Sequence, residues 1–209
     1  MKLSDCNFRD LYRKCVILKT NFEHAKEMFW EHFSYAPPAN MNAILCLCYI
    51  DSIAGMSFDF LTFANFENGE IDFSGYRNEL EGNIMLIIRY DNDFEAKIYT
   101  GDASVFSDRV KMIDESYHCD EKVLPTRNIK EIDHLRYIQN PDDIGVLLLK
   151  DGLQTEQVWV RLSGIENGNL AGLLLNEPNS DFGVHMNDRV NVQVTTRGND
   201  VYALCLLPK

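Results

Sequence analysis

The 209-residue chain has no long apolar run. No stretch approaches the roughly 20 apolar residues that a helix needs to cross a bilayer. The first residues, MKLSDCNFRDLYRK, form no apolar signal segment. We therefore expect a soluble, cytoplasmic protein. Its length fits either one large domain or two small ones.

Paired cysteines are missing too. The six cysteines form no C-x-x-C pair and no even ladder of spacings. Cys46 and Cys48 lie in the apolar run AILCLCYI, and Cys205 lies in YALCLLP. Buried free thiols commonly sit in such runs, so we expect six reduced cysteines, as in a cytosolic protein.

Basic residues are scarce relative to acidic ones. The chain has 20 Lys and Arg against 32 Asp and Glu, a formal net charge of -12. Phosphate backbones repel such a surface, so nucleic acid is not an expected partner. A basic protein is the expected partner, because complementary charge steers association. Acidity also serves solubility alone, and that interpretation stays open.

The common nucleotide and catalytic motifs are absent. The sequence contains no G-x-x-x-x-G-K-[ST], no G-x-G-x-x-G and no G-x-S-x-G. Asp181–Gly183 reads DFG, as in protein kinases, but the chain lacks their glycine-rich loop and catalytic-loop motif. We therefore expect no cofactor and no enzymatic activity.

The clearest element present is a helix over TNFEHAKEMFWEHF, residues 20–33. Thr20 and Glu23 fit a capping box, with Thr20 as the N-cap. His24 and His32 lie two helical turns apart, too far to share one metal ion, and are read as ordinary helix residues. The prolines of SYAPPAN end the helix. Apolar residues recur at helical spacing: Phe22, Ala25, Met28, Phe29 and Phe33.

A block of strands follows this helix. The segments AILCLCYI, MSFDFLTFANF, GEIDFSGY, NIMLIIRY and FEAKIYTG are rich in β-forming residues and are separated by turn signals such as ENGE, EGN and DND. Asp59 and Thr62 interrupt the apolar residues, which predicts strands with one solvated face. A short helix is expected over Asp108–Tyr117.

The second half repeats the order of helix, then strands. We place the boundary in the polar connection near Cys119–Pro125, which gives domains 1–120 and 121–209. TRNIKEIDHLRYIQNP predicts an amphipathic helix stopped by Pro141. The segments DDIGVLLLKD, EQVWVRLSGIE, GNLAGLLLNEP, DRVNVQVTT and VYALCLLP predict five strands. Trp159, flanked by valines, is expected in the core.

The predicted fold class is therefore α+β. Two small subdomains each pack a helix on an antiparallel sheet, and the C-terminal sheet is an open sheet or a partly closed small β-barrel.

The stretch LLNEPNSDFGVH, Leu174–His185, connects two of these strands. One interpretation is a structural connection, in which Pro178 and Gly183 shape the backbone and Phe182 anchors the loop in the core. The other is a polar site for binding, for a divalent cation or for acid–base chemistry. Its candidate residues are Glu177, Asp181, His185 and Asp188. We favour the structural interpretation and expect no bound metal.

The segment Val158–Val192 resembles a bacterial family of domains of unknown function. The family pattern is similar to G-x-L-x-N-E-P-x-x-D-F-G-V-H-x-G-D, with Asn187 here in place of the glycine that directly precedes the final Asp. Such modules resemble those in immunity-type proteins. The matching residues are Gly172, Leu174, Asn176, Glu177, Pro178, Asp181, Phe182, Gly183, Val184, His185 and Asp188.

The favoured hypothesis is a non-enzymatic binding protein of the bacterial cytoplasm, an immunity protein that blocks a toxin with its acidic surface. The alternative is a metal-binding or hydrolytic module on the Glu177–Asp188 loop. A third hypothesis is a module that acts by assembling with itself. The sequence leaves the oligomeric state open.

Overall fold

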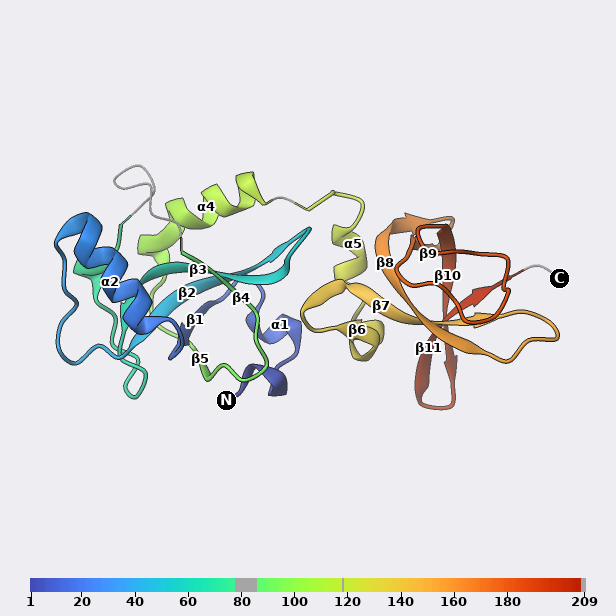
Figure 1. Cartoon of the computed structure of the whole chain (residues 1–209), viewed down its shortest axis with the longest axis horizontal. Coiled ribbons are helices and arrows are strands. Elements are labelled where there is room, and N and C mark those ends of the chain that lie inside the picture. The colour runs from blue at the N-terminus through green and yellow to red at the C-terminus, as the bar shows by residue number, and fades with distance from the viewer. Residues whose placement is uncertain (78–85, 118, 208–209) are drawn as a thin grey trace. The chain divides into compact units, whose positions relative to one another are not determined.

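The computed structural model describes residues 1–77, 86–117 and 119–207. The fold is α+β, and the chain divides into two compact units, Met1–His118 and Cys119–Lys209, each with its own sheet (Figure 1). The boundary placed from the sequence lies at residues 120/121.

The first unit is built on a sheet in which all neighbouring strands are antiparallel. The strand order is β4-β3-β2-β1-β5. The strand β1 was not predicted, because a four-residue apolar run, CVIL, does not reveal its secondary structure by periodicity. The strands are β1 (Cys15–Leu18), β2 (Ala43–Asp51), β3 (Gly55–Ala64), β4 (Ile87–Arg89) and β5 (Ala96–Ile98).

Two helices, α2 (Phe22–Phe33) and α4 (Ser107–Ser116), cover opposite faces of this sheet. The ring of Phe29 on α2 lies 5.0 Å from that of Phe60 on β3. Arg109 on α4 binds Asp59, the residue before Phe60. Consecutive strand residues point to opposite faces, so each helix covers its own face. Shorter helical segments are η1 (Leu3–Asp5), α1 (Phe8–Leu11), η2 (Phe73–Gly75) and η3 (Ser104–Phe106).

This layering overturns the prediction of a solvated face. Asp59 is 2% exposed and Thr62 is fully buried. Asp59 accepts two hydrogen bonds from the guanidinium of Arg109, at 2.5 and 3.0 Å, and the Thr62 hydroxyl donates to the carbonyl of Asp72 at 2.6 Å. These polar residues do not mark a solvated face; their side chains form hydrogen bonds inside the unit, as most buried polar groups do.

Two other local predictions differ from the structure, and a third lies partly outside the described residues. The predicted capping box is wrong: α2 begins after Asn21, which has a left-handed backbone (φ 59°) and makes no side-chain cap. GEIDFSGY forms one isolated bridge at Ile71 and the turn η2 instead of a strand. The turn signal EGN and residues 83–85 of the expected strand NIMLIIRY lie outside the described residues.

The second unit is a closed five-stranded barrel with a short extra strand, β6, on β7. Neighbouring strands from β7 to β11 are antiparallel, and β11 returns to pair in parallel with β7 at Leu204–Leu147. In a meander of five strands the first and last run the same way, so closure must be parallel. The strands are β6 (Arg136–Tyr137), β7 (Asn140–Leu149), β8 (Glu156–Glu166), β9 (Asn169–Leu174), β10 (Arg189–Arg197) and β11 (Asp200–Leu206).

The five long strands confirm those predicted from the apolar runs. The core is formed by their inward-facing aliphatic residues. Alternation along β8 is the clearest example: Val158, Val160 and Leu162 are buried, whereas the residues between them are not. One face of each strand therefore fills the barrel.

The long amphipathic helix predicted before these strands is wrong. The segment instead forms α5 (Leu124–Arg127), the 3-10 helix η4 (Lys130–Leu135) and β6, and Pro141 lies within β7. The buried guanidinium of Arg136 donates to the carbonyls of Thr126 and Pro141, both at 2.6 Å. A continuous helix would not bring these two carbonyls to one side chain, so this tertiary contact overrides the local helical pattern.

Candidate functional site

The polar loop identified in the sequence joins β9 to β10. Two backbone hydrogen bonds join its ends. Asn187 N–H donates to the carbonyl of Leu174 at 2.8 Å, and Leu174 N–H donates to the carbonyl of Asp188 at 2.9 Å. The loop therefore starts and ends at one point on the rim of the barrel.

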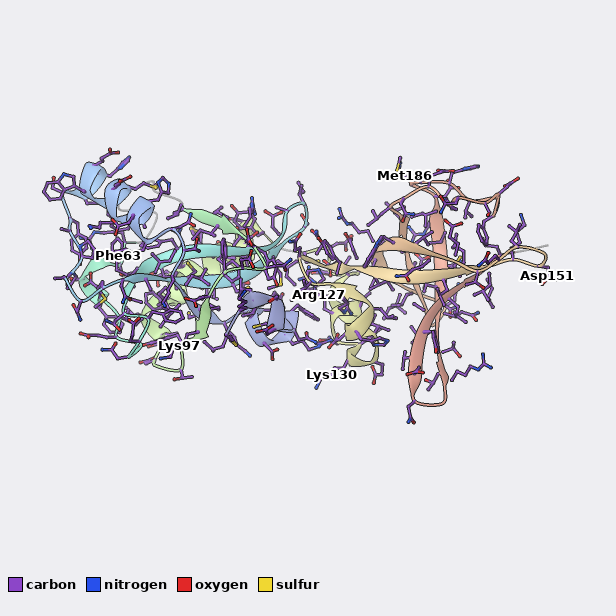
Figure 2. All side chains as sticks on the ribbon, turned by 60° about the horizontal axis from the view of Figure 1, so that its bottom comes forward. Phe63, Lys97, Arg127, Lys130, Asp151 and Met186 are labelled. Atoms are coloured by element: carbon purple, nitrogen blue, oxygen red, sulfur yellow. The ribbon has the colours of Figure 1, made fainter. Side chains whose placement is uncertain are left out.

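Phe182 holds the middle of the loop. Its side chain is 2% exposed and belongs to the barrel core. Pro178 is also buried, and Gly183 adopts a positive φ of 77°, which a residue with a Cβ would reach only with strain. The apolar anchor and the glycine together turn the backbone out again: Val184 is still partly buried against the barrel core, and residues 185–189 are exposed. The exposed Met186 lies on this outer part (Figure 2).

Three carboxylates of the loop bind its own backbone. Glu177 accepts from Met186 N–H at 2.8 Å, Asp188 accepts from His185 N–H at 2.7 Å, and Asp181 accepts from Gly183 N–H at 3.1 Å. Such bonds satisfy N–H groups that no strand partner reaches. These three carboxylates therefore stabilise the conformation of the loop itself.

Only two of the four candidate side chains contact each other. Nδ1 of His185 lies 2.7 Å from Oε1 of Glu177, and both side chains are exposed. The Met186 N–H and then the imidazole lower the pKa of Glu177, and the Glu177 carboxylate raises the pKa of His185. Each partner thus stabilises the charged form of the other.

Within the described residues, no group of three or more His, Cys, Asp and Glu side chains is placed to hold a metal ion. Asp181 and Asp188 are directed at backbone N–H groups, which leaves the Glu177–His185 pair alone. One exposed pair provides neither a ligand set nor a positioned nucleophile.

A residue distant in the chain, which the sequence did not point to, also binds this loop. Glu156, at the start of β8, accepts from the backbone and side-chain N–H groups of Asn179 at 2.7 and 2.8 Å, and from Ser180 N–H at 3.3 Å. Nothing in the local pattern around Glu156 indicates this role, because the contact depends on how β8 and the loop meet in the barrel.

Trp159 corrects another prediction. It was expected in the core but is 38% exposed, and its ring lies 5.7 Å from that of Tyr137. Its neighbours Val158 and Val160 are buried. Strict alternation along a strand places the residue between two inward valines on the outer face, and this signal was available in the sequence.

Five of the six cysteines are buried, and Cys119 is partly exposed. All six are free thiols, and Cys46 and Cys48 are buried on the central strand β2. Burial raises the pKa of the Cys15 thiol to about 11, which leaves it protonated near neutral pH.

Comparisons with protein-family models, curated proteins and solved structures found no match. The resemblance of Val158–Val192 to a bacterial family therefore stays a prediction. Among the described residues, no helix has both the length and the apolar character to cross a membrane.

Proposed function

We propose that this chain is a non-enzymatic binding protein that recognises a basic protein partner through its acidic surface. We further propose that it acts in the bacterial cytoplasm as an immunity protein, which neutralises a toxin by occluding its active site. The observation that carries the proposal is the charge of the first unit: Met1–His118 has 19 acidic against 11 basic residues, whereas Cys119–Lys209 has 13 against 9.

Support comes from where these carboxylates lie. Among the described residues the buried acidic side chains are Asp59, Asp72 and Asp143. Asp59 and Asp143 each bind an arginine, and Asp72 accepts from hydroxyl groups. The remaining described carboxylates are at least partly exposed, so most of the negative charge faces solvent.

Such a surface suits occlusion. A negative field attracts a basic partner over roughly one Debye length, about 8 Å at physiological salt, and speeds association. Acidic side chains that cover a basic active-site rim would block an anionic substrate without any chemistry on this chain. The alternative of a metal-binding or hydrolytic module has no comparable observation behind it.

The test is capture followed by a functional assay. The full chain is immobilised, exposed to bacterial extract at about 0.05 M salt and eluted at about 0.5 M salt, since screening weakens exposed charge contacts. We expect a basic protein whose enzymatic activity falls as the purified chain is added at stoichiometric amounts. Retention that does not depend on salt, or a captured protein whose activity is unaffected, would contradict the proposal.

A further inference from the structure

The outer face of α2 carries a row of exposed carboxylates. Glu23, Glu27 and Glu31 recur every fourth residue, and all three are exposed. At 1.5 Å rise per residue their Cα atoms are about 6 Å apart along the helix axis. The opposite face, with Ala25 and Phe29, is buried against the sheet. The helix therefore presents a regular row of carboxylates to solvent.

A tryptophan borders this row on one side. Trp30 is 60% exposed, an unusual position for so large an apolar side chain. At 100° per residue it projects about 20° from Glu23, about 60° from Glu27 and about 100° from Glu31 around the helix. No ring or cation contact to the Trp30 ring is found among the described residues. The indole adds apolar area and an aromatic face to the acidic stripe.

Two of the three carboxylates on this face have no cationic partner among the described residues. Lys26 lies 3.3 Å from Glu23, which forms an exposed ion pair. Neither Glu27 nor Glu31 contacts a cation within the described residues. His24 is the other titratable group on this side, and it is exposed. Two carboxylates beside an open indole thus remain available to a ligand.

We propose that this face of α2 docks an arginine-rich segment of the partner protein, an inference that rests on the proposed function. Arginines every second residue of an extended segment, or every fourth of a helix, recur about 6–7 Å apart and match the carboxylate spacing. A guanidinium also stacks on an indole, through a cation–π contact that an ammonium makes less well. Tryptophan and arginine are the residues that most often dominate binding energy at protein interfaces.

The test uses the intrinsic fluorescence of Trp30. The chain has two tryptophans, so a Trp159→Phe background of the full chain leaves Trp30 as the single reporter. The probe is a peptide with arginine at every second position, and the control peptide carries citrulline, the neutral isostere, at those positions. We expect a saturable change in Trp30 emission at low salt with the arginine peptide alone.

Matched variants locate the site. Glu27→Gln with Glu31→Gln should weaken peptide binding about three- to tenfold, as expected for two exposed ion pairs. Glu121→Gln with Glu131→Gln removes the same charge from exposed positions of the second unit and should change the dissociation constant less than about twofold. Trp30→Ala, measured by calorimetry, should weaken binding about two- to fivefold. All five substituted residues are exposed, and thermal melts verify folding.

Each outcome bears on a separate claim. Binding that is salt-dependent but equal in both double variants would overturn the α2 site while leaving an acidic binding surface elsewhere. No binding at low salt would also overturn the site, and the capture experiment then decides the proposed function independently. A Trp30→Ala variant that changes the mass measured by light scattering would show that a second copy covers this face, which overturns the arginine-segment proposal.

Discussion

At the scale of residues, individual buried side chains stabilise each unit, and Phe182 is the clearest example. It is the only large apolar residue between Leu175 and Val184, and it belongs to the barrel core. Phe182→Ala should destabilise the chain by about 3–5 kcal/mol, because it leaves a cavity in the core. Chemical denaturation measures this change.

The matched control is Met186→Ala on the same loop. The Met186 side chain is 51% exposed, so its removal should change stability by less than about 0.5 kcal/mol. If the Phe182 variant unfolds at the same denaturant concentration as the wild type, the anchor role is wrong.

The buried pair Asp59–Arg109 gives a second prediction at this scale. Both side chains are at most 3% exposed. Asp59→Asn leaves the arginine charge buried with a weakened partner, so we expect a loss of about 3–5 kcal/mol. Asp114→Asn breaks the exposed pair with Arg13 and should cost about 0–1 kcal/mol. Equal effects of the two substitutions on the unfolding midpoint would contradict this ranking.

At the scale of elements, carboxylates stabilise the loop between β9 and β10 through hydrogen bonds. One of these contacts, the Glu177–His185 pair, depends on pH. Glu177 raises the pKa of His185. The contribution of His185 to the stability of the fold is therefore fully present below the ordinary histidine pKa and is lost as pH rises through the raised value. The pKa of Glu177 is lowered, so its contribution is present above the ordinary glutamate pKa and is lost as pH falls through the lowered value.

Both side chains are therefore charged, and the ion pair is fully formed, in mildly acidic solution, between the ordinary pKa values of glutamate and histidine. Titration of His185 by NMR should give a pKa above the ordinary histidine value, and Glu177→Gln should return it toward that value. An imidazole that titrates identically in wild type and variant would show that the contact does not persist in solution.

At the scale of the whole molecule, each unit has its own sheet and its own core, and an exposed connection joins them. Asp120, Glu121 and Lys122 are all exposed. We expect limited proteolysis to cut this connection first, because solvent-exposed polar loops are cleaved before sheets, and to release two fragments that resist further digestion. Mass spectrometry of the first products locates the cut. A first cut inside either sheet would contradict the independence of the units.

Much of the second unit was predictable from the sequence for a local reason. The apolar runs from Asp142 onward alternate or end at glycine turns, and a strand's identity depends mainly on its own residues and the turns beside it. The anchor role expected of Phe182 followed similarly, since a polar loop offered no other apolar side chain. The outward position of Trp159 was also readable from the valines beside it.

Other features depend on contacts between segments far apart in the chain. The return of β11 to β7, the burial of Asp59 against Arg109, and the three hydrogen bonds from the loop to Glu156 leave no mark on the neighbouring sequence. Arg136 shows the mechanism: its bonds to two distant carbonyls outweigh a helical pattern of apolar residues. Local periodicity is encoded within a few residues, whereas the partner of a buried polar group is chosen only when the chain has packed.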